Sequence, residues 1–489
     1  MAAMLQGGAD VVKNCQQPLE VTMNPLYSEE QLQWVTRTWA ESIIWTLPGT
    51  RQTAESLAPP PWGHGLPAAM MKDRGGNGLR VGYLSSNLQG GAVFLMIQGL
   101  WRSHARAGED NAAGVSVYTY STVVLENINN KAESYRELVA YTEHRQLPYP
   151  GDRIGSGEMI RRDNNHVLVN VNGWCDAGAN ELLPARLAPV QMSYMGYPGS
   201  MGAAAWTDVL ISDSIASPPE WQHHYTEKLM YIPYSYYIND FRARLPEMGD
   251  ANLARGDGSL APAATGNLTR RALALPDDAF VYVCFSRAEK IDRDMFGAWM
   301  RILEQTPNSV LWLLKDTKGK VPGETFVTKH LKATAAAFGV DPSRLIFAKP
   351  IQWADHVRRG ALADLFLDTW AYNAHSTGCN SLWAGVPLLT MADVKMAQRV
   401  AAGMNRAASA GVYTVRTREE YVDLAVRLGR NARRSQRLRS AVFANRVSAP
   451  LFQTRAMVHT LERGYRMSAD VYAHTGLYMH LVPSWPLVR

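Results

Sequence analysis

The sequence predicts an α/β protein with two doubly wound lobes. Short apolar runs rich in Val, Ile, Leu and Tyr recur along the chain, as expected of parallel strands buried on both faces. Helix-length segments such as 292–305 and 417–428 separate several of them, and this alternation is typical of parallel sheets. Residues 242–271, rich in Gly, Ala, Pro and Asn, break the pattern and predict a linker between two parts of similar size.

Ten strands are expected, and one helix precedes them. Ser28 and Gln31 form a capping-box pattern ahead of an apolar stripe that includes Leu32, Val35 and Trp39, so this helix should pack on the first lobe. The predicted strands are residues 79–85, 116–121, 166–172, 208–212, 228–232, 280–285, 309–314, 344–348, 365–368 and 387–391.

Composition excludes several classes of protein. The chain has 489 residues, with 50 Lys and Arg against 44 Asp and Glu, so a net charge of +6 favours an anionic ligand without requiring nucleic acid. Apolar stretches end well short of the roughly 18 residues of a membrane span, and the first residues do not resemble a secretory signal. Four scattered cysteines without Cys-x-x-Cys spacing indicate neither a zinc site nor a disulfide framework. We therefore expect an intracellular protein.

The most informative segment is 356–390. His356 and Arg359 lie three residues apart on a short predicted helix and project to the same side. After the strand at 365–368, a polar loop ends at His375, Ser376 and Thr377, where a new helix begins. Backbone N–H groups and hydroxyls at a helix start suit a diphosphate. The alternatives are that Ser376 only caps the helix and that His356 and Arg359 belong to a solvated face.

Two further segments suggest ligand contacts. Arg287 and Lys290 follow the carboxyl end of strand 280–285, where two cations could neutralise a phosphate, although for this segment alone ordinary loop solubility is the favoured explanation. Gly196, Pro198 and Gly199 form a tight turn that a ligand could approach, or a turn with a purely structural role.

An ordered set of segments then makes a resemblance specific. The sequence resembles the catalytic region of protein O-linked N-acetylglucosamine transferases over most of the chain from residue 79 to about 472. The similar segments are LRVGYLSS (79–86), APVQMSYMGYPGSMG (188–202), SPPE with YTEKLMYIP (217–233), PNSVLWLLK (307–315), HVRRG (356–360), HSTG with SLWAGVPLLTM (375–391) and SAPLFQT (448–454).

This resemblance implies a GT-B glycosyltransferase with two Rossmann-like lobes facing a cleft. It implies transfer of N-acetylglucosamine from UDP-N-acetylglucosamine to Ser or Thr hydroxyls of proteins, with inversion and without a metal. The Asp292-x-Asp294 step lies in a first helical turn and is interpreted as capping. The implied organisation is an extension (1–78), an acceptor-side lobe (79–241), a linker (242–271), a nucleotide-sugar lobe (272–447) and a helix that crosses back, with a tail (448–489).

The resemblance also assigns roles to residues. Lys290 matches the lysine that neutralises the leaving diphosphate, and His375 lies near the sugar; these two are the catalytic candidates. The other candidates bind the nucleotide sugar. Ser376 and Thr377 would hold the phosphates, His356 and Arg359 the uracil with the backbone of Ile351, and Gly196, Tyr197 and Pro198 would close over the sugar.

The chain departs from the family at several positions. Asn87 follows Ser85 and Ser86 where the family has an aspartate, and the family histidines of this lobe are absent. Asn380 stands in place of an aspartate that holds the ribose, Trp353 in place of a lysine and Arg287 in place of a glutamine, all at nucleotide-binding positions. The alternatives are therefore a nucleotide-sugar-binding pseudoenzyme, or a related transferase that uses GDP-fucose.

The helical repeats that usually precede the catalytic region in this family have no counterpart in the sequence, so the resemblance implies that acceptor recognition differs or depends on a separate adaptor. No membrane or nucleic-acid partner is expected, and the location implied is the cytoplasm, the nucleus or both. One basic helix stripe, Arg430, Arg433, Arg434 and Arg437, could meet an anionic lipid or nucleic acid, although a solvated face is the simpler interpretation.

Overall fold

The chain folds into two compact units in this computed structural model. The structure describes residues 22–23, 27–46, 78–88, 90–110, 114–123, 133–175, 178–249, 265–266, 268–315 and 325–486. Most of the predicted extension (1–78) and the central part of the predicted linker (250–264 and 267) lie outside the described residues. The first unit contains residues up to Asp240, apart from 23–25, together with Gln453–Arg489; the second contains Phe241–Phe452.

The first unit is built on a seven-stranded parallel sheet in the order β3-β2-β1-β4-β5-β6-β7. Its central strand β1 is buried along almost its whole length, which explains its apolar sequence. The strands are β1 (Leu79–Ser85), β2 (Val115–Ser121), β3 (Glu143–Gln146), β4 (Val167–Asn170), β5 (Val190–Ser193), β6 (Val209–Ser212) and β7 (Lys228–Tyr231).

The second unit contains a six-stranded parallel sheet in the order β10-β9-β8-β11-β12-β13. The order reverses on either side of β8, so the carboxyl ends of β8 and β11 meet at the point where open α/β sheets bind ligands. The strands are β8 (Phe280–Cys284), β9 (Ser309–Leu314), β10 (Leu345–Ala348), β11 (Leu365–Leu367), β12 (Leu388–Met391) and β13 (Thr414–Val415). The predicted fold class, two α/β lobes with parallel sheets, is confirmed.

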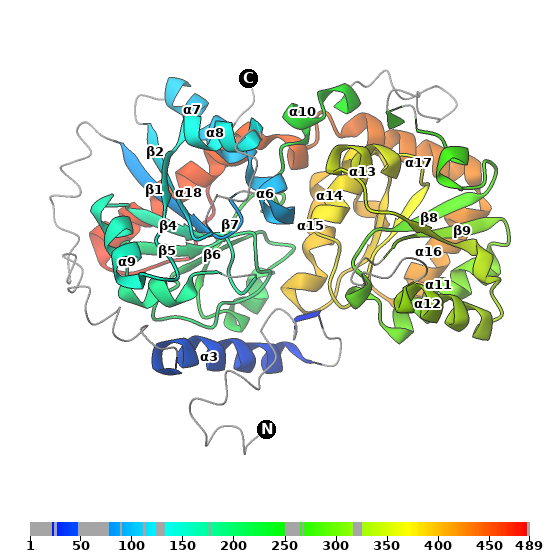
Figure 1. The fold of residues 1–489 in the computed structure, drawn as a ribbon, viewed down its shortest axis with the longest axis horizontal. Helices are drawn as coiled ribbons and strands as arrows, with labels where there is room; N and C mark the ends of the chain where they lie inside the picture. The colour runs from blue at the N-terminus through cyan, green and yellow to red at the C-terminus, as the bar shows by residue number, and fades with distance from the viewer. Residues whose placement is uncertain are drawn as a thin grey trace, which may run out of the picture. The chain divides into compact units, whose positions relative to one another are not determined.

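Helices flank each sheet (Figure 1). In the first unit, α18 packs against α7 although about 350 residues separate them in the sequence. The helices of the first unit are α3 (Glu29–Thr46), α6 (Gly91–Ile97), α7 (Gly99–Asp110), α8 (Glu133–Tyr141), α9 (Arg153–Arg162) and α18 (Thr454–Thr475). Those of the second are α10 (Phe241–Arg244), α11 (Arg293–Gln305), α12 (Phe326–Ala337), α13 (Trp353–Gly360), α14 (Ser376–Trp383), α15 (Val400–Ala407), α16 (Arg418–Arg430) and α17 (Ala432–Asn445).

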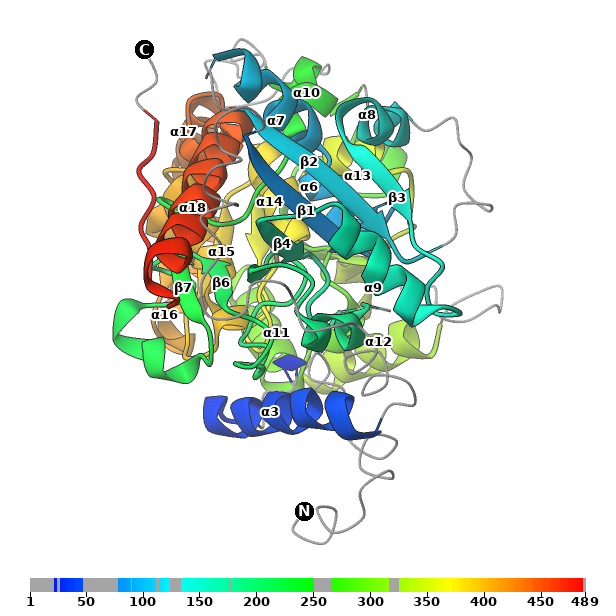
Figure 2. The ribbon, with the colours of Figure 1, turned by 90° about the vertical axis from the view of Figure 1, so that its left-hand side faces the viewer.

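Helix α3 lies on the outside of the first unit (Figure 2). The predicted capping box is confirmed, because the N–H of Ser28 donates to Gln31 Oε1 at 2.8 Å and the N–H of Gln31 to Ser28 Oγ at 3.2 Å. The predicted packing is confirmed as well: Trp39 meets Trp174 edge to face, with ring centroids 6.2 Å apart. A partly buried tryptophan packed on the buried Trp174 in this way fixes an otherwise peripheral helix.

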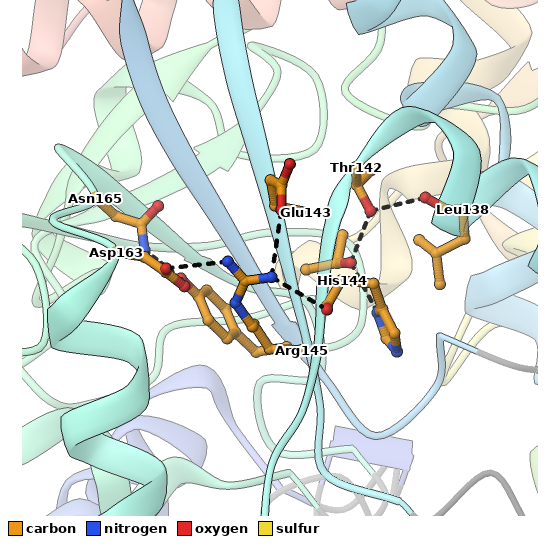
Figure 3. A network of polar contacts seen from close by, with 9 residues as sticks. Leu138, Thr142, Glu143, His144, Arg145, Asp163 and Asn165 are labelled. Carbon is orange, nitrogen blue, oxygen red and sulfur yellow. Dashed lines mark hydrogen bonds and ion pairs between the residues drawn. The ribbon is translucent and has the colours of Figure 1, made fainter.

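The edge strand β3 is held by polar side chains, which Figure 3 shows. Arg145 pairs with Asp163 at 3.4 Å, and the hydroxyl of Tyr120, from the neighbouring strand β2, donates to the same carboxylate at 2.7 Å. His144 Nδ1 lies 2.9 Å from the hydroxyl of Thr119, also on β2. Because its sequence, Glu-His-Arg-Gln, has no apolar run, β3 was not among the predicted strands.

The predicted basic helix stripe is wrong in one respect. The helix breaks at Asn431, whose side chain accepts the N–H of Arg434 and caps α17. Arg430 therefore ends α16, whereas Arg433, Arg434 and Arg437 belong to α17. No helix in the described part of the chain is long and apolar enough to cross a membrane.

Gly385 is expected to be essential for the packing of α14 on α17. Its φ is +75°, and an added Cβ would lie 2.2 Å from Cδ2 of Phe443. We expect Gly385→Ala to destabilise the protein by about 2–4 kcal/mol, since strain and overpacking add. The measurement is chemical denaturation, with Gly411→Ala as control because no atom lies within 4 Å of the Cβ there. An equal change in both variants would contradict the expectation.

Candidate functional site

The side chain of Lys290 is held against the loop that precedes α14. Lys290 ends a 3-10 turn (Ala288–Lys290) at the carboxyl end of β8. Its Nζ donates to the carbonyl of Asn373 at 2.9 Å and lies 4.0 Å from the centroid of the Tyr372 ring. The loop and the ammonium group are thus one unit, which we call the Lys290 cluster: Lys290, Tyr372, Asn373, His375 and Ser376.

The loop itself is shaped by one buried carboxylate. Asp368 follows β11, and its Oδ1 accepts the N–H of Thr369 at 2.8 Å and that of Ala374 at 2.6 Å. Its Oδ2 accepts the hydroxyl of Thr390 at 2.7 Å. Burial raises the pKa of Asp368, while these hydrogen bonds and the positive charge of Lys290 act in the opposite direction. A fully buried group with this many partners fixes the backbone around it.

Helix α14 begins without a side-chain cap. His375 is the N-cap residue, and no side chain closes its first turn. The first intrahelical bond is the N–H of Cys379 to the carbonyl of His375 at 3.0 Å, which leaves the preceding N–H groups at the positive end of the helix dipole. The half-buried hydroxyls of Ser376 and Thr377 stand at this end. These are the groups that an anion binds.

His375 is uncharged in this setting. Its ring lies 4.5 Å from that of Tyr372, centroid to centroid. Burial, reinforced by the positive charge of Lys290, holds the pKa of His375 well below its usual range. The positive charge of the Lys290 cluster therefore belongs to the ammonium group.

His356 and Arg359 form a pair inside the second unit, so a solvated face is excluded for Arg359. Arg359 is 2% exposed, its Cζ lies 4.9 Å from the centroid of the Phe285 ring, and it donates to the carbonyl of Lys349 at 2.5 Å. Its Nη2 lies 2.7 Å from Nδ1 of His356. Burial lowers the pKa of His356 to about 4, and the charge of Arg359 adds to the effect. With Nδ1 accepting from Arg359, the proton of the neutral ring resides on Nε2, which becomes a hydrogen-bond donor.

The structure brings His356 together with Thr377 and Asn380. All three line one small cavity of about 10 Å³ between α13 and α14. Asn380 Oδ1 accepts the indole N–H of Trp353 at 3.4 Å, and the Trp353 ring stacks on Phe241. Two of the positions that depart from the family pattern are thus bonded to each other.

Two predicted site residues are directed to solvent. The side chain of Arg287 is 66% exposed and lies 4.0 Å from Glu289, so it does not join the Lys290 cluster. Ile351 is 43% exposed, in the segment between β10 and α13. Only its backbone was assigned a role, and an exposed side chain is compatible with that assignment.

The turn at Gly196 belongs to the first unit. Gly196 is required there, because an added Cβ would lie 2.2 Å from the carbonyl oxygen of Val171. The side chain of Tyr197 is 2% exposed in the core, and its hydroxyl lies 3.0 Å from that of Thr22. Tyr197 and Pro198 are therefore buried, and any contact of Tyr197 with a ligand would come from its backbone.

Uncharged groups occupy the carboxyl end of β1. Ser85 Oγ donates to Asn172 Oδ1 at 2.8 Å, and Asn172 Nδ2 donates to Ser86 Oγ at 2.8 Å. The N–H of Asn87 donates to Ser85 Oγ at 3.0 Å. This amide–hydroxyl network contains no side chain that titrates near neutral pH.

Sequence reasoning did not identify Asp368, Tyr372 and Asn373 as site residues. Asp368 gave a usable signal, because it directly follows a buried strand, where polar side chains gather at ligand sites. Tyr372 and Asn373 act through a ring face and a backbone carbonyl, which no residue pattern reveals. Among the described residues, no group of three or more His, Cys, Asp or Glu side chains is suited to a metal ion. Asp292 caps α11 by accepting the N–H of Met295 at 2.8 Å, as expected.

The chain contains two α/β units with parallel sheets, which is the architecture of GT-B glycosyltransferases. In the second unit, an uncapped helix start lies at the switch point of the sheet. The chain belongs to glycosyl transferase family 41, whose model matches residues 63–259 and 252–461.

The curated relatives are longer proteins that this chain matches over part of their length. The chain is 33% identical over 414 residues to a probable UDP-N-acetylglucosamine–peptide N-acetylglucosaminyltransferase, SEC, from Arabidopsis thaliana, covering 83% of this chain and 38% of that protein. It is 29% identical over 480 residues to the UDP-N-acetylglucosamine–peptide N-acetylglucosaminyltransferase of Caenorhabditis elegans, covering 79% and 40%. The chain thus spans about two fifths of the length of these relatives.

Solved structures support the fold. An O-GlcNAc transferase from Thermobaculum terrenum superimposes with a TM-score of 0.70 at 23% identity, covering 93% of this chain and 77% of that one. A sucrose-phosphate synthase from Thermosynechococcus elongatus gives a TM-score of 0.51 at 14% identity, covering 81% and 100%.

The pKa of His356 makes a prediction about stability and pH. The unfolded chain takes up this proton near pH 6.5, but the folded protein only near pH 4, so the wild type loses stability as the pH falls through this window. The loss amounts to about 3 kcal/mol for this group. We expect His356→Gln to abolish this part of the loss of stability between pH 7 and pH 4.5, which is measured as the free energy of unfolding at the two pH values. His330→Gln, at an exposed position on α12, is the matched control. An unchanged pH dependence in His356→Gln would count against a buried neutral ring.

Proposed function

We propose that this chain transfers N-acetylglucosamine from UDP-N-acetylglucosamine to Ser and Thr hydroxyls of proteins, with inversion at the anomeric carbon and without a metal. The observation that carries the proposal is the contact of Lys290 Nζ with the carbonyl of Asn373, three residues before the uncapped start of α14. The activities named for the relatives from Arabidopsis thaliana and Caenorhabditis elegans support the donor and the acceptor.

In the proposed donor complex, the diphosphate lies between Lys290 and the first N–H groups of α14. The two negative charges of the diphosphate are stabilised by the ammonium group of Lys290, by backbone N–H groups and by the hydroxyls of Ser376 and Thr377. His356 faces the uracil as a neutral donor through Nε2, positioned by Arg359. Asn380 holds a ribose hydroxyl through its amide group, more weakly than a carboxylate would.

In the proposed transfer step, the acceptor oxygen attacks the anomeric carbon while the bond from that carbon to the β-phosphate oxygen breaks. The electron pair of that bond passes to the leaving UDP, whose added negative charge is stabilised by Lys290 and by the α14 dipole. The acceptor proton passes to a phosphate oxygen of the donor. No protein base is assigned to this step, and Ser85, Ser86 and Asn87, where the family has an aspartate, carry only hydroxyl and amide groups. The missing base would slow the reaction by about a hundred- to ten-thousandfold compared with a relative that has one.

Acceptor delivery and cellular location are part of the same proposal. A separate adaptor protein would present acceptors to this catalytic region. The proposed location is the cytoplasm, the nucleus or both, in keeping with four cysteines that show no paired spacing.

Lys290 offers the direct test. We expect Lys290→Ala to lower kcat/KM for labelled UDP-N-acetylglucosamine by about 100- to 1000-fold, because the charge on the leaving phosphate loses its ammonium partner. The assay measures label transfer to a mixed protein acceptor, and Lys329→Ala, at an exposed position on α12, is the control.

The remaining outcomes separate the alternatives. Binding of UDP-N-acetylglucosamine without any transfer by the wild type would identify a pseudoenzyme. Preference for GDP-fucose would identify a different donor. Transfer by Lys290→Ala at the wild-type rate would refute the role assigned to the ammonium group.

A further inference from the structure

A second cavity lies at the amino-terminal edge of the sheet in the second unit. We call it the amino-edge cavity; its volume is about 740 Å³, within the range of small-molecule sites. Its walls come from the start of β8 (Ala279 and Phe280), the residues before β9, Asp364 before β11, and helix α17. Strands β8 and β9 and α17 are labelled in Figure 1.

This cavity is separate from the Lys290 cluster. Strands β8 and β11 are parallel and begin at the cavity, whereas their carboxyl ends lead to Phe285 and Asp368 at the other edge of the sheet. Five residues of β8 at about 3.3 Å each place the two edges about 16 Å apart. A ligand in the amino-edge cavity therefore does not occupy the proposed donor site.

The inner wall of the cavity carries excess positive charge. Arg439 is 8% exposed; its Nη1 lies 3.5 Å from Asp364 Oδ1, and its Nη2 donates to the carbonyl of Ala361. Asp364 is shared, because its Oδ2 also accepts Arg270 at 2.7 Å and the N–H of Val281 at 2.8 Å. Two guanidinium groups thus face one carboxylate.

The buried guanidinium of Arg439 is incompletely paired. Its Nε has no hydrogen-bond partner among the described residues. A buried cation with too few partners costs free energy, and the negative charge of an anion in the cavity would offset part of that cost. Burial also lowers the pKa of Arg439, in line with a charge that has too few partners.

The approach to the cavity is also positive on one side. Helix α17 contains four arginines and no acidic residue. Arg430 lines the rim, where its Nε donates to the carbonyl of Gln305 at 2.8 Å and fixes the guanidinium group in place. The opposite rim carries the exposed Asp277 and Asp278, which suit ligand hydroxyls and disfavour a second anionic group.

We propose that the amino-edge cavity binds a small hydroxylated metabolite with a single phosphate group, of the sugar-phosphate class. The phosphate lies toward Arg430 and Arg439, and the hydroxyls face Asp277 and Asp278. Ser435 and Gln436 of α17 supply further hydrogen-bonding groups to the same wall.

Calorimetric titration with glucose 6-phosphate tests the site in the intact protein. We expect saturable binding of glucose 6-phosphate and weaker binding of glucose or inorganic phosphate alone. Arg430→Glu should raise the Kd at least about tenfold, because it reverses the charge on the cavity rim. Arg433→Glu is the matched control: Arg433 is exposed on α17 and does not line the cavity, so its Kd should change by less than about threefold. Lys290→Ala should leave the Kd unchanged, which separates this site from the proposed donor site.

Three results would overturn the proposal. The first is the absence of saturable binding of glucose 6-phosphate up to about 10 mM, because a Kd above that concentration is too weak for a specific metabolite site. The second is an equal loss in Arg430→Glu and Arg433→Glu, which would indicate a general effect of surface charge. The third is loss of binding in Lys290→Ala, which would place the phosphate in the proposed donor site instead.

Discussion

The hydrogen bond from Lys290 to the carbonyl of Asn373 is the interaction on which the functional account depends. It joins the carboxyl end of β8 to the loop that leads into α14, so a cation and a helix start from different parts of the chain become neighbours. The ring face of Tyr372 supports the same ammonium group. Neither the ammonium group of Lys290 nor the start of α14 alone would neutralise the charge of a diphosphate, but together they place a full positive charge beside a helix dipole.

Asp368 preorganises the loop that places Lys290 beside the start of α14. Its carboxylate accepts hydrogen bonds from both ends of the loop and from Thr390 on β12, so the loop is fixed to two adjacent strands of the sheet. A ligand that binds there does not have to order the loop, which reduces the entropic cost of binding. The same logic applies to His356, whose tautomer is set by the buried Arg359 before any base arrives.

Much of this could be predicted from the sequence. All ten expected strands occur, because each is a largely apolar run, and the capping patterns at Ser28 and Asp292 mark helix starts. Three strands were missed: β3 is polar, β5 is short and combines polar and apolar residues, and β13 has only two residues. The segments that form the Lys290 cluster were singled out from the sequence, but Arg287 was assigned to the same site and lies in solvent, while Asp368 was overlooked. Whether a polar residue such as Arg287 or Asp368 belongs to the site depends on its burial and its loop contacts, which the periodicity of the sequence does not reveal.

A crystal structure of the protein with bound UDP would show whether Lys290 and the start of α14 hold the diphosphate together. We expect the β-phosphate within about 3 Å of both Lys290 Nζ and the first N–H groups of α14, with the uracil beside His356. Phosphates bound elsewhere, with the ammonium of Lys290 still on the carbonyl of Asn373 and no contact to the nucleotide, would contradict it.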